Sequence, residues 1–314
     1  MLTVPPEALL PVPPEELLQR LSPAPVAGLS LSNVSVLRLD LCGSHACGNK
    51  SFKLRPYLQR ATAQSLPLLS FGGAWSNHLH ALAAAGFEQG LKTLGIVRGG
   101  ESETATLRDV ERWGMRVQRV SRSEYRRRGE ADYLAYLQDM HGPCVVVPEG
   151  GASTAAASAC ADIAQLINQL APQSRHVVLA VGTGTTLAGL AAGLRIDAEV
   201  VGISALRGAT DLDQRVTDLL AQLPADAVAD WRILHEFHAG GFARCSADLK
   251  AFILEFEAVH GIPLEPVYTG KALHAVWQMV ASGELAEDAS VLVVHTGGLQ
   301  GRRGYDWLSS SVSS

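Results

Sequence analysis

Strand-like and helix-like segments alternate along most of this chain, and short turns join them. Apolar runs such as 68–71 and 176–181 have the length of buried strands, and each is followed by a glycine turn and a helical pattern. Alternation of this kind predicts parallel βαβ units, whose ligands bind at the carboxyl ends of the strands. The sequence therefore predicts an α/β fold with a site at those ends.

Hydrophobic periodicity sets the expected limits of the elements. The predicted strands are 35–40, 68–71, 91–97, 116–120, 144–147, 176–181, 199–204 and 290–295. The predicted helices are 50–63, 77–87, 105–113, 123–140, 154–170, a segment ending at 194, 210–223, 246–259 and 271–282. Pattern alone leaves a domain boundary open, because no fixed repeat and no Pro/Ser/Gly linker divides the chain.

The composition limits the classes of protein to which this chain can belong. A chain of 314 residues is long enough for two domains, and 47% hydrophobic with 6% aromatic residues predicts aliphatic cores typical of α/β enzymes. A net charge of −5 lacks the basic surface of a nucleic-acid-binding protein, so we expect no nucleic-acid partner. The basic run 126–128 has acidic neighbours and is expected to lie on a solvated helix face.

The cysteines and the N-terminal segment favour a cytoplasmic location. Five cysteines are an odd number, scattered through a chain that is large enough to fold without disulfides. The first twenty residues are rich in proline and lack the basic start and apolar segment of a signal peptide. A Gly-Thr loop interrupts the longest uncharged run, 177–194, so we expect this run to be buried and expect no membrane partner.

A short cluster of metal-ligating residue types occurs at Cys42, His45 and Cys47. A structural zinc site needs a second pair of Cys or His ligands at suitable spacing, and none follows. We therefore expect no metal.

Two loops have the form of a binding site. Lys50 follows a glycine turn at the start of a predicted helix, where an amine can be aimed into a cleft, although a single lysine is more often a solvated charge. The Gly-Thr loop 182–186 opens another predicted helix, where free N–H groups and the helix dipole favour a phosphate. A capped turn or a dinucleotide site also fits this loop, but the loop is not G-x-G-x-x-G and lacks a correctly spaced acidic ribose partner.

A lysine at a helix start, a phosphate loop and a Ser-Asn-His turn at 76–78 together suggest a compact phosphorylated aldehyde, and pyridoxal 5′-phosphate fits. Six motifs cover nearly the whole chain: GNKSFKL at 48–54, GGAWSNH at 72–78, PEGG at 148–151, TGTTLAG at 183–189, PVYTGK at 266–271 and HTGG at 295–298. In this order they resemble the 1-aminocyclopropane-1-carboxylate deaminase and D-cysteine desulfhydrase family.

The resemblance implies a two-domain, parallel-sheet fold of the tryptophan synthase β-like, fold-type II pyridoxal-phosphate enzymes. It implies a small domain at 50–163 inserted into a large cofactor-binding domain formed by 1–49 and 164–314. A homodimer that acts on a small-molecule amino acid is also expected.

The resemblance further implies roles for single residues. Lys50 matches the lysine to which the cofactor is attached, and Asn77 matches the asparagine that binds the ring hydroxyl. Lys53 and the loop 183–186 match phosphate contacts, and Tyr268 matches a group that faces the substrate. The implied catalytic residues are Lys50, Ser76 and Tyr268, and the implied cofactor-binding residues are Lys50, Lys53, Asn77, Thr183, Gly184, Thr185, Thr186, Thr269 and Thr296.

Two positions bear on the reaction. Deaminases of the family usually have Glu after the PVY tyrosine and Leu before the last Gly-Gly, whereas desulfhydrases have Ser or Thr at both; this chain has Thr269 and Thr296. A neutral hydroxyl near the pyridine nitrogen holds its proton less strongly than a carboxylate does, which suits an easier elimination. We therefore expect α,β-elimination on a small D-amino acid, as in conversion of D-cysteine to pyruvate, ammonia and sulfide.

Alternatives stay open at this point. Deamination of the cyclopropane acid to 2-oxobutanoate is the first, and a non-catalytic pyridoxal-phosphate-binding protein is the second. A nucleotide-dependent oxidoreductase is the third alternative, and only the loop 182–189 supports it. Cys47, Trp75 and Phe242 depart from the family pattern, so another β-substituted D-amino acid also fits as substrate. Tyr268 also fits a buried structural phenol, while His78 is expected on a helix face and His295 in a strand end.

Overall fold

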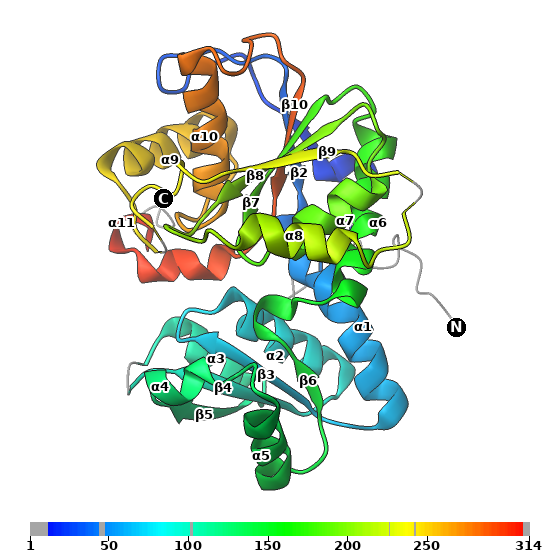
Figure 1. The fold of residues 1–314 in the computed structure, drawn as a ribbon. Helices are drawn as coiled ribbons and strands as arrows, with labels where there is room; N and C mark the ends of the chain where they lie inside the picture. Colours follow the sequence, from blue (N-terminus) through cyan, green and yellow to red (C-terminus); the bar gives the residue numbers. More distant parts are fainter. Residues whose placement is uncertain (1–11, 44–47, 101–102, 226, 242, 310–314) are drawn as a thin grey trace.

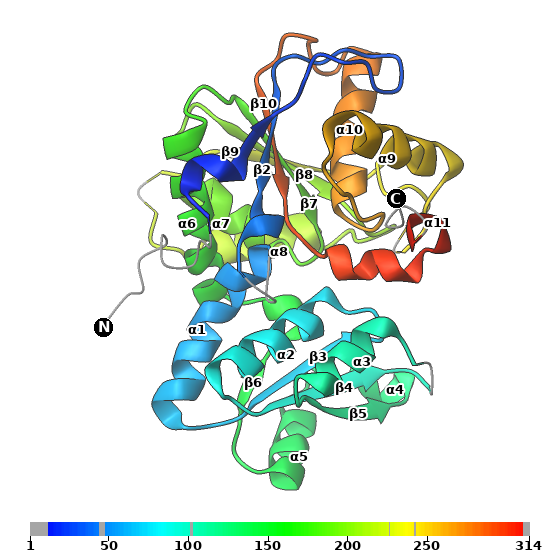
Figure 2. The same cartoon turned by 180° about the vertical axis from the view of Figure 1, so that it is seen from behind.

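Two sheets, each flanked by helices, form the two lobes that are visible in a computed structural model of the chain (Figures 1 and 2). The structure describes residues 12–43, 48–100, 103–225, 227–241 and 243–309. The larger sheet has the order β1 (Leu18–Arg20), β2 (Val34–Arg38), β10 (Val291–His295), β7 (His176–Val181), β8 (Glu199–Ser204) and β9 (Asp230–Leu234). Only the pair β1–β2 in this sheet is antiparallel.

The smaller sheet is parallel throughout and comes from one continuous part of the chain. Its order is β5 (Arg116–Val120), β4 (Thr93–Arg98), β3 (Leu68–Gly73) and β6 (Val145–Val147). Helices α1 (Asn49–Gln64), α2 (Asn77–Gln89), α3 (Ala105–Arg112), α4 (Arg122–Arg126) and α5 (Ala131–His141) precede or connect its strands. The predicted α/β fold with parallel sheets is confirmed, whereas the division of the chain at residues 50 and 163 remains a prediction.

The remaining helices follow strands of the larger sheet or lie near its ends. They are α6 (Thr154–Leu170), α7 (Thr185–Gly193), α8 (Leu212–Leu220), α9 (Ala247–His260), α10 (Thr269–Ser282) and α11 (Asp306–Ser309). Short 3-10 segments are η2 (Pro14–Leu17), η3 (Leu39–Leu41), η4 (Glu149–Gly151) and η5 (Leu299–Gly304). Among the described residues, no helix is both long and apolar enough to span a membrane.

The central strand β7 shows why the apolar runs become strands buried on both faces. Val177 and Leu179 pack into the core that contains α6 and α7, whereas Val178 and Ala180 pack into the core that contains α9 and α10. Alternate residues of a strand point to opposite faces, so a continuous apolar run is needed when helices cover both. The carboxyl end of β7 is thereby fixed beneath the Gly-Thr loop.

Two expected elements differ clearly from the structure, and two strands were not expected. The helix predicted at 123–140 is two helices, α4 and α5, separated by a turn in which Glu130 N donates to Arg127 O at 2.8 Å. Gly129 lies in this turn, and glycine favours a break in a helix. The strand predicted at 35–40 ends at Arg38, because the next three residues form η3. The short strands β1 and β9 were not predicted.

Candidate active site

Lys50 lies in the first turn of α1, and the loop after β10 anchors this turn. Asn49 N donates to Thr296 O at 3.2 Å. Gly48, at the N-cap, has a φ of 82°, and a Cβ there would lie 2.2 Å from the same carbonyl oxygen. Only glycine permits this approach. The half-buried Lys50 donates from Nζ to Asn49 Oδ1 at 3.0 Å.

The Gly-Thr loop meets the same turn of α1, although the two segments are more than 100 residues apart. Asn49 Nδ2 donates to Thr186 Oγ1 at 2.9 Å, and Lys53 Nζ donates to Thr183 Oγ1 at 3.1 Å. Lys50 and Lys53 are three residues apart and therefore lie on one helix face. The structure thus brings together both lysines and the loop that the sequence singled out.

The other residues of the loop shape the start of α7. Gly184 is the N-cap of this helix and has a φ of 79°, and a Cβ there would lie 2.7 Å from Val216 Cγ2. Thr183 Oγ1 and Thr185 Oγ1 are 3.0 Å apart. Unpaired N–H groups at a helix start and adjacent hydroxyls are well suited to phosphate oxygens.

The electrostatics of the site also favour an anion. Lys53 is only 3% exposed, and burial, followed by the charge of Lys50, lowers the pKa of its amine from 10.5 to about 7. Two neighbouring amines repel each other when both are charged, and an anion between them relieves this repulsion. A phosphate is therefore expected to stabilise the charged form of Lys53.

The Ser-Asn-His turn lies at the start of α2, where it also contacts the loop after β10. Ser76 is the N-cap of α2, and its Oγ accepts a hydrogen bond from Leu79 N at 3.2 Å. Asn77 Oδ1 accepts a hydrogen bond from Gln300 Nε2. A Cβ at Gly298, whose φ is 87°, would lie 2.3 Å from Asn77 Nδ2. Asn77 is therefore held close to a glycine backbone that follows β10.

His78 is buried, at 4% exposure, rather than lying on an open helix face. Its Nε2 lies 2.7 Å from Ser70 Oγ, which donates to Val147 O at 2.7 Å. A carbonyl oxygen can only accept, so the serine accepts from His78 Nε2–H, and His78 Nδ1 carries a lone pair. Within the described residues Nδ1 has no hydrogen-bond partner, and it lies 3.8 Å from where a Cβ of Gly151 would be.

The charge state of His78 agrees with this tautomer. Burial, followed by the charges of Lys50 and Lys53, lowers the pKa of His78 well below its usual value. The ring is therefore neutral and presents an acceptor beside the two lysines. Sequence reasoning missed this feature, since burial of a helical histidine depends on the packing of β3 and η4 around it.

Tyr268 lies against the glycine that begins the Gly-Thr loop. A Cβ at Gly182 would lie 3.5 Å from Tyr268 Cε1, which is van der Waals contact with the ring. Tyr268 is half-buried, and burial, followed by the charge of Glu265, raises the pKa of its phenol. The phenol therefore stays protonated at neutral pH. Its ring places this tyrosine beside the predicted phosphate loop.

Thr269 is nearly fully buried, and its hydroxyl is engaged within its own turn. Thr269 Oγ1 accepts from Glu265 N at 3.0 Å, and Thr269 N donates to Glu265 Oε1 at 2.9 Å. Glu265 was not identified from the sequence. The signal that could have found it is the position of a carboxylate four residues before the start of α10, where free N–H groups need acceptors.

Other predicted positions are placed as follows. Thr296 is half-buried and contributes its carbonyl to the start of α1, and Trp75 is 41% exposed beside Gly304. His295 is fully buried in the end of β10 and donates from Nε2 to Pro263 O at 2.8 Å. The remaining sequence-based predictions, for His45, Cys47 and Phe242, concern residues outside the described ranges.

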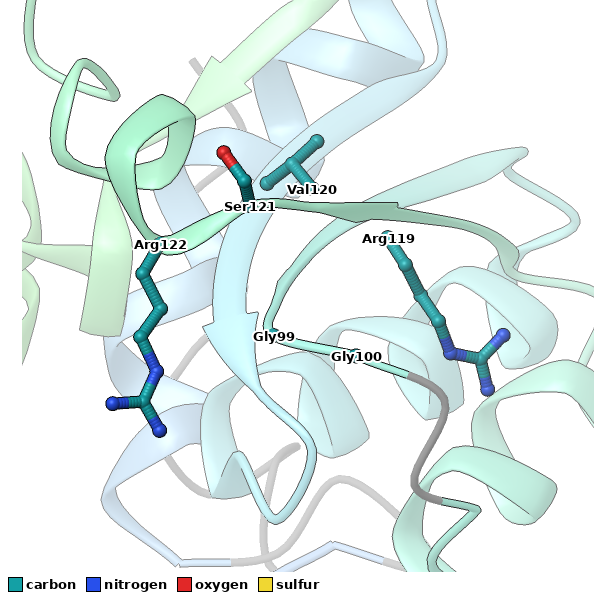
Figure 3. Close-up of a pocket in the computed structure, with 6 residues that line it drawn as sticks. All are labelled: Gly99, Gly100, Arg119, Val120, Ser121 and Arg122. Atoms are coloured by element: carbon teal, nitrogen blue, oxygen red, sulfur yellow. The ribbon is translucent and has the colours of Figure 1, made fainter.

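Of two hollows in the described part of the chain, one reaches a predicted site residue and the other does not. One of about 410 Å³ lies at the carboxyl ends of β4 and β5, where Arg119 and Arg122 flank Gly99 and Gly100 (Figure 3). Its described lining contains none of the predicted site residues. The other, of about 230 Å³, reaches Thr183 of the Gly-Thr loop.

Known proteins are similar to this chain in sequence and in architecture. Residues 31–297 match the model of the family described as "Pyridoxal-phosphate dependent enzyme". A putative 1-aminocyclopropane-1-carboxylate deaminase of Thermotoga maritima is 30% identical, with 86% of this chain and 89% of the relative covered. A D-cysteine desulfhydrase of Salmonella paratyphi A is 27% identical, with 91% of each covered.

A solved structure described as an ACC deaminase homologue superposes with a TM-score of 0.77 at 26% identity, and 88% of each chain is covered. The family match spans most of the chain and includes the Lys50 and Gly-Thr segments. The chain therefore belongs to the pyridoxal-phosphate-dependent enzymes, in the family that contains the 1-aminocyclopropane-1-carboxylate deaminases and D-cysteine desulfhydrases.

Proposed function

We propose that this enzyme is a lyase that catalyses α,β-elimination on a small D-amino acid, with D-cysteine giving pyruvate, ammonia and sulfide. The observation that carries the proposal is the meeting of Lys50, Lys53 and the Gly-Thr loop at the start of two helices. The choice of substrate is supported by the two threonines at 269 and 296 and by relatives that are named for this activity.

The residues present fit pyridoxal phosphate. Lys53 donates to a hydroxyl of the Gly-Thr loop, and burial lowers the pKa of its amine to about 7, while Lys50 lies on the same helix face. Glycines at 48 and 298 allow close approaches of Thr296 and Asn77 that a Cβ would block, and the buried Nδ1 of His78 offers an acceptor beside the lysines. When bound, this cofactor supplies an electron sink for the substrate Cα.

Each predicted residue then has a distinct task. Lys50 holds the cofactor and moves the proton at the substrate Cα, which suits an amine kept in a partly buried site. Lys53 and the loop 183–186 hold the phosphate, and Asn77 holds the ring hydroxyl. Loss of the Cα proton and cleavage of the Cβ–S bond release sulfide, and water then releases ammonia and leaves pyruvate.

Tyr268 is proposed to face the substrate. Its raised pKa keeps the phenol protonated, so it is able to donate a hydrogen bond to a departing thiolate. Ser76 is proposed to face the substrate through the start of α2, although its Oγ also caps that helix. Thr269 and Thr296 are proposed to lie near the pyridine nitrogen, where neutral groups favour elimination over ring opening.

A substrate panel tests the proposal. The purified enzyme is incubated with D-cysteine, L-cysteine, β-chloro-D-alanine and 1-aminocyclopropane-1-carboxylate, and sulfide, pyruvate and 2-oxobutanoate are measured. We expect sulfide and pyruvate from D-cysteine. 2-oxobutanoate from the cyclopropane acid, without sulfide from D-cysteine, would instead assign the deaminase reaction.

Variants separate catalysis from cofactor binding. Lys50→Ala is expected to lose both turnover and the visible absorbance of the attached cofactor, whereas the exposed Lys92→Ala is the matched control and keeps both. A cofactor-loaded wild type that turns over none of the four compounds and shows no spectral change with them would support a non-catalytic binding protein.

A further inference from the structure

Glu265 is a buried carboxylate whose side-chain hydrogen bonds, among the described residues, lie in the turn that carries Tyr268. Its side chain accepts hydrogen bonds from Val267 N at 2.8 Å, from Thr269 N at 2.9 Å and from Tyr268 N. It is 1% exposed, so these N–H groups, rather than water, satisfy its oxygens. The carboxylate therefore fixes the backbone on both sides of Tyr268.

The reason for this arrangement is visible at the start of α10. Tyr268 occupies the N-cap position and makes no capping hydrogen bond with its side chain. Ser, Thr, Asp or Asn at that position would ordinarily cap the helix through a side-chain oxygen. Glu265 takes over this task, which leaves position 268 free to carry a phenol.

Lys271 lies in the first turn of the same helix and is also 1% exposed. Its Nζ donates to Ala205 O at 3.2 Å and to Gly241 O at 2.8 Å. Ala205 follows β8, and Gly241 lies in the segment before α9. The lysine thus ties two loops to the helix start. Burial raises the pKa of Glu265 to about 7, and the backbone hydrogen bonds and then the charge of Lys271 oppose this rise.

We propose that Glu265 is a positioning residue for Tyr268, which it holds over Gly182 through the backbone of Val267–Thr269, with Lys271 as the buried counter-charge. Burial of charged groups is a weak source of stability compared with apolar packing. The hydrogen bonds of Glu265 instead converge on the segment that carries the phenol. The inference rests on the proposed function only in so far as Tyr268 acts on the substrate.

The first arm of the test reads the position of the ring without turnover. A fluorotyrosine label at position 268 is followed by ¹⁹F NMR in the cofactor-loaded enzyme. Glu265→Gln keeps the shape but loses the charge and half of the acceptor capacity, so we expect the resonance to shift or broaden. Glu199→Gln, which breaks an ion pair at the amino end of β8, is the matched control and leaves the resonance unchanged.

The second arm is a double-mutant cycle on sulfide release. Glu265→Gln is expected to lower kcat by about 10- to 100-fold with KM changed less than about threefold, since the effect acts after binding. In the Tyr268→Phe background the same change is expected to cost less than about twofold, because both substitutions remove one function. Lys271→Met provides a second route if the Gln variant does not fold, and is expected to shift the same resonance.

The outcomes are distinguishable. An unchanged Tyr268 resonance in Glu265→Gln, or an equal fall of kcat in both backgrounds, would overturn the inference. A shifted resonance together with full activity of Tyr268→Phe would support the positioning and refute the proposed role of the phenol.

Discussion

Replacing Lys53 by methionine tests whether the pKa of this amine is lowered in the folded, cofactor-free enzyme. Burial and the charge of Lys50 lower its pKa from 10.5 to about 7. The unfolded chain keeps the proton up to its pKa of 10.5, whereas the folded chain releases it above pH 7. The neutral form of Lys53 therefore contributes fully to the unfolding free energy above the unfolded pKa of 10.5. This contribution is lost as the pH falls through the folded pKa of about 7.

The size of the effect follows from the displacement of the pKa. One pKa unit corresponds to about 1.4 kcal/mol, so the charged form of Lys53 costs the folded state about 5 kcal/mol. Between about pH 8 and about pH 9.5, the wild type should gain about 2 kcal/mol of unfolding free energy relative to Lys53→Met. Titrating groups that do not interact with Lys53 cancel in this difference because both proteins contain them.

Denaturant unfolding of both cofactor-free proteins at the two pH values measures this gain. Lys92→Met, which removes an exposed lysine, is the control and should follow the wild type. Inorganic phosphate should reduce the pH slope of the wild type, because an anion in the Gly-Thr loop raises the pKa of Lys53. Equal pH slopes in the wild type and Lys53→Met would refute the reasoning.

Three further substitutions have expected outcomes. Gly298→Ala places a Cβ 2.3 Å from Asn77 Nδ2, and it should weaken cofactor binding at least about tenfold in an absorbance titration. Thr269→Glu buries a second carboxyl group beside Glu265, and it should lower the melting temperature by several degrees without creating deaminase activity. Ser76→Ala removes the cap of α2 and should cost about 1 kcal/mol in urea unfolding, whereas Ser76→Gly should cost only a few tenths.

Local signals predicted most of the fold and the main site residues. Glycine turns after apolar runs located the carboxyl ends of the strands, and these turns do precede α2 and α7. The helical spacing of Lys50 and Lys53 also placed both amines on one face. The sequence alone did not fix the contact between Lys53 and Thr183, because that contact depends on how the two sheets are arranged.

What the sequence did not show depends on tertiary contacts or on weak local signals. Gly129 was too weak a signal against the helical periodicity of 123–140, although it lies in the break between α4 and α5. The burial of His78 requires Ser70 from β3 as a partner, and such a pair has no signature in the chain. Glu265 had a local signal, but the motif at 266–271 that follows it predicted a role for Tyr268 only.

The loop after β10 contacts the starts of two helices that carry predicted site residues. Its Thr296 carbonyl accepts from Asn49 at the start of α1, and its Gln300 side chain donates to Asn77 at the start of α2. Two of the helices that carry predicted cofactor residues, α1 and α2, are therefore positioned by the same few residues. A backbone change at Gly298, between these two contacts, should disturb both helices at once. The effect of a substitution in this loop thus depends on main-chain geometry as well as on the side chain of Thr296.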